Sequence, residues 1–198
     1  MSIKENLLQS AGATLENYNA SEYIFSERGI PHFYYQVLTG EVKLNNYDED
    51  GKEFIQNILG NDDSFGTSML CIHKTYPVNA IAISKCVIIK LQKDSFFRLL
   101  EEFPSLYNEV FKSLSERLYK KVVLMRKISC RSAAERLKEV MQLMKDEHID
   151  QSPFSFVIPL TRQQLASLTG LCVETTIRTI KKMEREKIVR IENRKILY

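Results

Sequence analysis

Glu174 and Arg178 are the residues whose types and spacing suggest chemistry most directly. An arginine can donate two hydrogen bonds to O6 and N7 of a guanine, and a carboxylate can accept one from N4 of a cytosine. Four residues apart on a helix, the two side chains would share one face. The same spacing permits an ordinary ion pair on a solvated helix, worth about 0.2–0.5 kcal/mol. The pair alone therefore leaves both interpretations open.

Two short helices joined at Gly170 are predicted to position this pair. Thr161 has the type of a helix N-cap, with Gln164 three residues later as in a capping box, and Gly170 can adopt the positive φ that a tight turn needs. The first helix would bury Leu165, Ala166 and Leu168. The second, over residues 173–186, is predicted to bury Ile177, Ile180 and Met183 and to turn outward Glu174, Thr175, Arg178, Lys181 and Lys182. A two-stranded wing over residues 188–191 and 195–198 would complete a winged helix-turn-helix.

Basic charge is concentrated in this segment. Residues 161–198 hold nine Lys or Arg against four acidic residues, a net charge of +5, whereas residues 1–100 hold nine against twelve, a net charge of −3. The whole chain carries only +3. The distribution of charge, rather than its total, favours a polyanionic partner for the C-terminal part.

The motif Val173-Glu174-Thr175-x-x-Arg178 resembles the recognition helix of the cyclic AMP receptor protein/FNR superfamily of bacterial transcription regulators. The resemblance extends over nearly the whole chain. It implies that Glu174 and Arg178 read a guanine–cytosine step in a TTGA-like half-site, with Ile177 where FNR-type proteins usually carry a serine. It also implies RNA polymerase as a partner. The full set of residues that we expect at the DNA is Thr161, Arg162, Gln163, Cys172, Val173, Glu174, Thr175, Arg178 and Lys182.

The N-terminal half has the texture of a small antiparallel β-domain. From Glu22 to about Leu91, short β-rich runs alternate with turn residues, and Asp50-Gly51 between two such runs is a hairpin signal. The spacing favours a small β-barrel or jelly roll. The predicted class is α+β, with a cyclic-nucleotide-binding-like β-barrel over residues 1–103, a long dimerisation helix over 104–128 and a winged helix-turn-helix over 129–198.

The resemblance also locates a tentative effector pocket in this β-domain, comprising Gly66, Thr67, Ser68, Tyr76 and Pro77. In members that bind cyclic AMP, a glutamate follows the glycine that matches Gly66, and an Arg-Ser pair further on holds the phosphate. Here Thr67 and Tyr76-Pro77 stand at those places, so the bidentate phosphate donor is missing. Cyclic AMP is not expected to bind. Another effector and a purely structural barrel remain two open interpretations.

Other cofactors are not expected. Four cysteines, at positions 71, 86, 130 and 172, form no Cys-x-x-Cys pair, and none precedes Cys71, whereas FNR proteins that hold an iron–sulfur cluster do so mostly through N-terminal cysteines. His73 could ligate a haem as in some gas-sensing relatives, or could be an ordinary solvated side chain. Cys172 could give redox control at a helix N-terminus, or could be a small cap residue. No metal site is predicted.

The segment from Pro104 to Ile128 reads as one long helix with two apolar faces. A stripe of apolar residues at spacings of three and four faces a partner in this interpretation: Tyr107, Phe111, Leu114, Leu118 and Met125, continued by Ile128. Leu106, Val110 and Val122 flank it. An ordinary buried helix is the alternative. In the resembling family this helix forms the dimer, and a hinge is expected at residues 128–130, with Ser132 as the cap of the next helix.

These observations predict a dimeric transcription regulator that reads pseudo-palindromic DNA. The alternative is a small-molecule-binding module whose helical C-terminal domain contacts protein. An enzyme on a jelly-roll barrel would need a histidine-rich metal site, and only His32 and His73 lie in that half. No apolar run approaches the roughly 20 residues of a membrane span, and the N-terminus lacks a signal-peptide core, so we expect a cytoplasmic protein.

Overall fold

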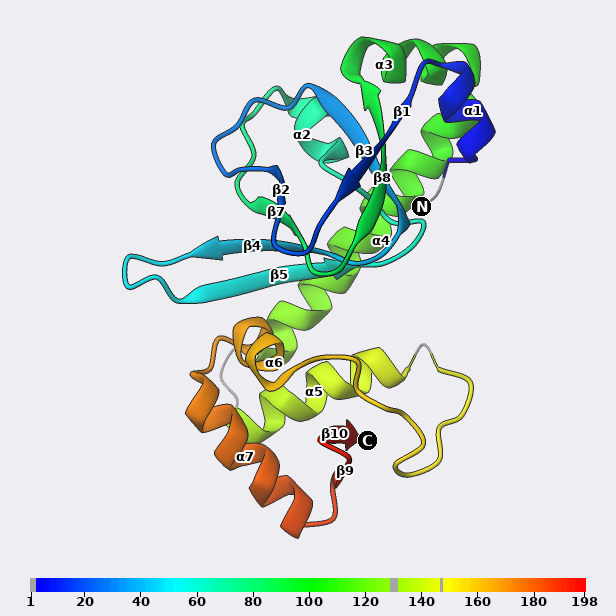
Figure 1. Ribbon diagram of the computed structural model, residues 1–198. Coiled ribbons are helices and arrows are strands. Elements are labelled where there is room, and N and C mark those ends of the chain that lie inside the picture. Colours follow the sequence, from blue (N-terminus) through cyan, green and yellow to red (C-terminus); the bar gives the residue numbers. More distant parts are fainter. Residues whose placement is uncertain (1–2, 129–131, 147) are drawn as a thin grey trace. The chain divides into compact units, whose positions relative to one another are not determined.

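A computed structural model of the chain describes residues 3–128, 132–146 and 148–198 (Figure 1). The chain forms two compact units, residues 1–118 and residues 119–198. The long helix α4 begins in the first unit and ends in the second. The elements of the first unit are α1 (Glu5–Ser10), β1 (Thr14–Tyr18), β2 (Tyr23–Phe25), β3 (Phe33–Thr39), β4 (Val42–Tyr47), β5 (Glu53–Leu59), β6 (Ser64–Phe65), α2 (Thr67–Ile72), β7 (Asn79–Ala82), β8 (Cys86–Gln92), α3 (Lys93–Glu102) and α4 (Ser105–Ile128).

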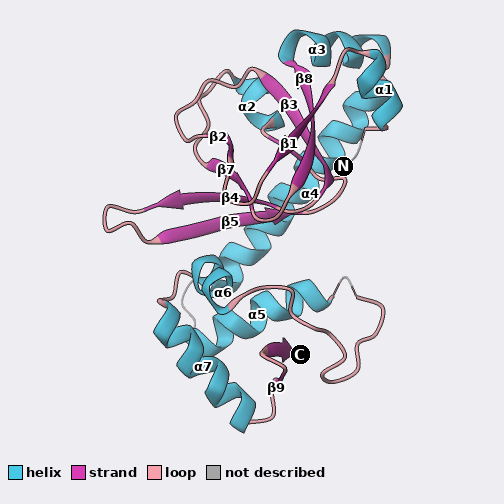
Figure 2. Cartoon of the chain, in the orientation of Figure 1, coloured by secondary structure: helices cyan, strands magenta, loops and turns pink. Residues whose placement is uncertain are grey.

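Two four-stranded antiparallel sheets make up the β-domain (Figure 2). Their strand orders are β1-β8-β3-β6 and β2-β7-β4-β5. The antiparallel β architecture that was predicted is thus confirmed, but it begins at Thr14 rather than at Glu22. The first strand escaped prediction because β1 is an edge strand with mostly exposed side chains, so its sequence lacks the alternation of a half-buried strand.

The hairpin between β4 and β5 confirms the turn predicted at Asp50-Gly51. Gly51 has a φ of 76°, its N–H donates to the Asp48 carbonyl at 3.0 Å, and the Asp48 N–H donates to the Lys52 carbonyl at 3.0 Å. Glycine adopts this left-handed conformation without steric cost. Turn chemistry therefore sets the register in which Tyr47 pairs with Glu53.

Two apolar clusters hold the first unit together. One packs α1, α3 and the start of α4 against the β1-β8-β3-β6 sheet, with Tyr34 stacked on Phe96 at a centroid distance of 4.7 Å. The other is rich in aromatic rings, with members from both sheets. Helix α3 begins at Lys93, after the N-cap residue Gln92, and Asp94 lies in its first turn. A carboxylate there still favours the helix through its dipole.

The second unit comprises the remainder of α4, α5 (Ala133–Lys145), α6 (Arg162–Thr169), α7 (Val173–Arg185), β9 (Arg190–Glu192) and β10 (Lys195–Leu197). Ser132 caps α5 through a complete capping box with Glu135, as predicted. Residues 154–158 contribute one β-bridge, between Val157 and Leu197. Pro153 and Pro159 flank that segment, and proline cannot donate to a ladder.

The hinge predicted at residues 128–130 falls on Ser129 and Cys130, which lie outside the described residues. Within the described ranges, no helix combines the length and the apolar character needed to cross a bilayer.

Candidate nucleic-acid interface

Helix α6 and the turn after it are built by local interactions that the sequence predicted. Oγ1 of Thr161 accepts from the Gln164 N–H at 3.1 Å, and Oε1 of Gln164 accepts from the Thr161 N–H at 2.8 Å. Gly170 ends the helix with a φ of 69°. Leu165 and Ala166 are buried, and Leu168 packs against the same core. The capped helix and its glycine turn set the direction in which α7 begins.

The buried stripe of α7 differs from the prediction at one residue. Ile180 and Met183 are buried as expected, but the third buried position is Thr176, and Ile177 is only half-buried. Ile177 is absent from the apolar core cluster of this unit and from the apolar residues packed against it. The prediction followed residue type, whereas burial follows the helical spacing, which places positions 176, 180 and 183 on one stripe.

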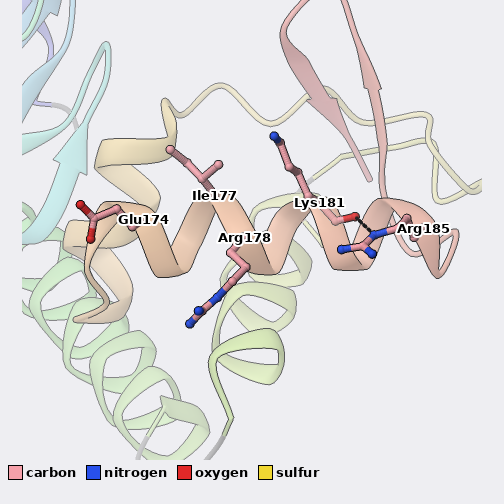
Figure 3. Close-up of a pocket in the computed structure, with 5 residues that line it drawn as sticks. All are labelled: Glu174, Ile177, Arg178, Lys181 and Arg185. Carbon is pink, nitrogen blue, oxygen red and sulfur yellow. Dashed lines mark hydrogen bonds between the residues drawn. The ribbon is translucent and has the colours of Figure 1, made fainter.

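The outward face of α7 carries a row of side chains at spacings of three and four. They line one shallow, open hollow along the helix: Glu174, Ile177, Arg178, Lys181 and Arg185 (Figure 3). Within the described residues, the side chains of Glu174 and Arg178 make no hydrogen bond or ion pair, so the ordinary i, i+4 ion pair does not form between them. Nε of Arg185 donates to the Lys181 carbonyl at 3.4 Å. Glu174 and Arg178 are exposed and available to a ligand.

The start of α7 brings together three other residues of the predicted contact set. The Cys172 thiol occupies the N-cap position and donates a hydrogen bond to Oγ1 of Thr175 at 2.9 Å, and Val173 is exposed beside it. Hydrogen bonds from the hydroxyl and the N–H of Thr175 favour the thiolate and lower the pKa of Cys172 below its ordinary value. The helix N-terminus favours an anion in the same way.

The remaining predicted contacts flank α7. Thr161 and Gln163 are exposed at the start of α6, and Arg162 donates from Nη1 to the Arg194 carbonyl at 3.1 Å, which ties α6 to the wing turn. Lys182 is exposed but pairs with Glu186 at 3.7 Å, and it is not among the residues that line the hollow.

Sequence reasoning missed part of the hollow. It assigned Ile177 to the core, turned Lys181 outward without including it in the contact set, and did not consider Arg185. The spacing Glu174, Arg178, Lys181, Arg185 was a usable signal, because residues three and four apart share a helix face.

In the β-domain, the structure brings together only some of the tentative pocket residues. A Cβ at Gly66 would lie 3.4 Å from Cε1 of Tyr76, and Thr67 and Tyr76 are buried, whereas Ser68 and Pro77 are exposed. The Tyr76 ring stacks on Phe25 at a centroid distance of 3.7 Å. Stacked and tilted rings thus fill the space beside Gly66.

The electrostatics of this region do not suit a phosphate. Burial, with a contribution from Glu16, raises the pKa of Tyr35 to about 12, and burial together with nearby Tyr35 raises that of Tyr76. Among the buried residues described in the first unit, none is charged. Oγ1 of Thr67 and the Tyr76 hydroxyl have no hydrogen-bond partner among the described residues. The tentative pocket residues themselves offer a phosphate hydroxyl groups but no cation.

Helix α4 has the two apolar faces that the sequence predicted. Leu106 and Val110 are buried in the core of the first unit, and Leu114 packs partly against it. The stripe residues Phe111 and Leu118 are 73% and 65% exposed, and Tyr107 and Met125 are exposed as well. No described residue of the chain covers this apolar stripe.

The cofactor candidates show ordinary environments. His73 is exposed just after α2, and its Nδ1 lies 3.0 Å from Nζ of Lys93 in a hydrogen bond. Across the described residues, no group of three or more His, Cys, Asp or Glu could hold a metal ion.

Comparison with known proteins identifies two family models that match this chain. The family model for a cyclic nucleotide-binding domain matches residues 15–103, and that for a Crp-like helix-turn-helix domain matches residues 135–198. The nitrogen fixation regulation protein FixK of Bradyrhizobium diazoefficiens is 28% identical over 181 residues, which cover 88% of this chain and 73% of FixK. The cAMP-activated global transcriptional regulator CRP of Haemophilus influenzae is 25% identical over 166 residues, 82% of this chain and 74% of that protein.

Solved structures agree on the fold. The c-di-GMP-responsive global regulator CLP of Xanthomonas campestris superposes with a TM-score of 0.83 over 98% of both chains, at 18% identity. Both family models, the relatives and this superposition point the same way. The chain therefore belongs to the cyclic AMP receptor protein/FNR family of transcription regulators, with a helix-turn-helix DNA-binding domain.

Proposed function

We propose that the protein is a sequence-specific regulator that binds pseudo-palindromic duplex DNA as a homodimer. Helix α7 lies in the major groove, where Arg178 donates to guanine and Glu174 accepts from cytosine. The observation that carries this proposal is the outward face of α7, on which both side chains are exposed and unpaired within the described residues although four residues apart.

The residues around the hollow position the helix on the DNA backbone. Thr161, Gln163 and Arg162 stand at the N-terminus of α6, where helix N–H groups favour a phosphate. Lys182 lies on the flank of α7. In this proposal its ion pair with Glu186 is replaced by a contact with a DNA phosphate. Cys172, Val173 and Thr175 lie at the first turn of α7, beside the bases or the backbone next to them.

The exposed stripe of α4 is the proposed dimer contact. A protein that reads two half-sites needs its two recognition helices about 34 Å apart, which a two-fold axis provides. Tyr107, Phe111, Leu118 and Met125 supply the apolar face, with Leu114 shared between this contact and the core. In functional terms we retain residues 1–103 as the β-domain, 104–128 as the dimerisation helix and 129–198 as the DNA-binding domain.

The β-domain is proposed to act without cyclic AMP. Tyr76 is buried against Phe25, and the buried residues described in this unit include no cation for a phosphate. An effector of a different kind would act by binding the DNA-competent arrangement more tightly than any other. RNA polymerase is the proposed protein partner, as the family membership suggests.

Salt dependence separates this proposal from a protein-contacting helical domain. The affinity of purified protein for a duplex would be measured by fluorescence anisotropy between 50 and 300 mM KCl. Each phosphate neutralised contributes a slope of about −0.9 to the plot of log K against log salt, so a contact set of this size predicts a slope of several units. A salt-insensitive affinity, or none with any duplex, would favour the protein-contacting alternative.

A further inference from the structure

The turn at the tip of the wing holds an arginine where glycine fits best. Strands β9 and β10 pair from Glu192 to Lys195, so Asn193 and Arg194 form a two-residue loop (Figure 1). Their φ angles are 48° and 66°, both in the left-handed region. Such a loop favours asparagine at its first position and glycine at its second. Asn193 follows this preference, and Arg194 does not.

The backbone of Arg194 therefore adopts a conformation that its side chain makes unfavourable. In the left-handed region the Cβ atom crowds the following carbonyl, and glycine avoids that cost. Nη1 of Arg162 donates to the Arg194 carbonyl at 3.1 Å and so holds the turn in place. Because this bond uses only the main chain of residue 194, a glycine could accept it equally well. The bond does not explain why the residue is an arginine.

The guanidinium of Arg194 has no partner among the described residues. It is exposed and makes no hydrogen bond or ion pair with them. Arg190, in the same hairpin, differs, because it pairs with Glu192 at 3.4 Å and lies over the Phe154 ring at 4.8 Å. A charged side chain kept at a strained position without an internal partner indicates a contact outside the chain.

The position of the turn indicates what that contact is. The Arg162 bond holds the tip of the wing beside the start of α6, where Thr161 and Gln163 are exposed. In the proposed complex this helix start lies on the DNA backbone, at the border of the major groove that holds α7. The groove on the other side of that backbone is the minor groove.

A contact with a phosphate alone would not require an arginine at this position. Lys195 is exposed next to it, without a left-handed backbone, and supplies a cation for the DNA backbone. The minor groove is only about 6 Å wide, and the tip of a two-residue hairpin is the narrowest part of the wing. Arginine is also a side chain that a narrow minor groove attracts. The strained position is thus the one from which a guanidinium can enter the groove.

We propose that Arg194 enters the minor groove that flanks each half-site, and that the protein thereby favours A·T-rich flanking DNA. The inference rests on the proposed DNA-binding function, but it concerns base pairs outside those that α7 reads. The selectivity is for the groove itself, because A·T tracts narrow the groove and the N2 amino group of guanine projects into it.

Exchanging the flanking base pairs tests this directly. Operators with identical half-sites would carry flanks of A·T, G·C or inosine·C pairs, where inosine is guanine without its N2 amino group. In anisotropy titrations, wild-type protein should bind the A·T and inosine operators with similar affinity and the G·C operator at least about fivefold more weakly. Arg194→Gly should bind all three with one affinity.

Lys187→Gly is the matched control. Lys187 is also exposed and basic, with a left-handed φ of 56°, but it lies directly after the C-cap of α7. This variant removes the same charge and the same backbone cost, so it should keep the full preference for A·T and inosine flanks. Circular dichroism checks the fold of Arg194→Gly, whose Tm should equal or exceed that of wild type because glycine suits the turn.

Equal affinity of wild-type protein for all three flanks, or a flank preference that persists in Arg194→Gly, overturns the assignment and leaves half-site recognition intact. A preference for A·T over both other flanks also overturns it, because inosine and guanine differ only in the minor groove. A protein that does not prefer the operator half-sites to random duplex contradicts the proposed function itself, and this inference with it.

Discussion

Arg178 and Lys182 are both basic and lie four residues apart, but their side chains have different surroundings. Arg178 lines the hollow on α7 with an unpaired guanidinium within the described residues, whereas Lys182 lies outside the hollow and pairs with Glu186. Arginine can bond bidentately to guanine, and lysine on a flank acts as a point charge. We therefore propose that base reading by Arg178 and phosphate binding by Lys182 are separable at this helix.

Replacing these two residues should separate specificity from affinity. Arg178→Ala should reduce discrimination between operator and random duplex by about 1–3 kcal/mol. Lys182→Ala should weaken binding to both duplexes by a similar factor and lower the salt slope by about 1. Anisotropy titrations of each variant with the two duplexes measure this, and equal losses on both duplexes for both variants would contradict the assignment.

Thr176 gives a prediction about stability within the same helix. It is fully buried, and its Oγ1 has no hydrogen-bond partner among the described residues. Because a buried unsatisfied hydroxyl is unfavourable, the nearly isosteric Thr176→Val should raise the free energy of unfolding by about 1 kcal/mol, or Tm by about 2–4 °C. Thermal unfolding followed by circular dichroism would show it, with Thr179→Val as a less buried control.

A lower Tm for Thr176→Val than for wild type would mean that the hydroxyl is satisfied in solution, for example by a water.

Thr176 also separates the features that the sequence could predict from those that it could not. The caps at Thr161 and Ser132 and the turn at Gly170 were predictable because their chemistry is local. The exchange of roles between Thr176 and Ile177 was not, because the rotation of α7 about its axis is fixed by the packing of its own Ile180 and Met183 into the core of this unit.

Among the elements, helix α4 buries one apolar face and leaves another exposed. Its first turns bury Leu106 and Val110 in the β-domain core, while Phe111 and Leu118 on another face remain exposed. An exposed apolar stripe of this length marks an interaction surface. The stripe was readable from the spacing of apolar residues alone, although the partial burial of Leu114 was not.

A charge placed on this stripe should separate the protomers. Phe111→Asp is expected to yield monomers in sedimentation velocity, since a carboxylate would lose its water in the interface without a partner. Fold stability should change little, because Phe111 is 73% exposed in the single chain.

Lys112→Asp is the matched control. Lys112 is exposed next to the stripe, and its ion pair with Glu116 is long, at 4.0 Å, so this variant should remain dimeric. Dimers that persist in Phe111→Asp at the wild-type dissociation constant would exclude the stripe as the contact.

The strands show which elements a single sequence predicts well. Hairpin β4–β5 was predictable because Asp50-Gly51 fixes its turn. Strand β1 was missed because an exposed edge strand has little apolar alternation.

At the scale of the whole molecule, the family resemblance predicted the fold correctly and also indicated where this chain departs from it. Thr67 and Tyr76-Pro77 replace the residues that hold cyclic AMP in related proteins. What the sequence could not show is that Tyr76 turns inward and stacks on Phe25 at 3.7 Å, because that depends on contacts between distant segments.

Cyclic AMP should therefore have no effect on the protein. At 1 mM, the nucleotide is expected to leave Tm within 0.5 °C of the free value and the operator affinity unchanged, because no buried cation stands ready for its phosphate. A ligand at 100 times its Kd would instead add about 2.7 kcal/mol to the free energy of unfolding. A clear rise in Tm or in DNA affinity would contradict this account of the β-domain.

Selection of random duplexes by purified, ligand-free protein would test whether a dimer of this chain reads DNA through α7. Sequencing of the recovered DNA should yield a pseudo-palindrome, with a guanine in each half-site and half-site centres about 34 Å apart. The same selection with Arg178→Ala should lose the preference for that guanine. Recovery of no enriched sequence by the wild-type protein, with or without bacterial small-molecule extract, would contradict the claim.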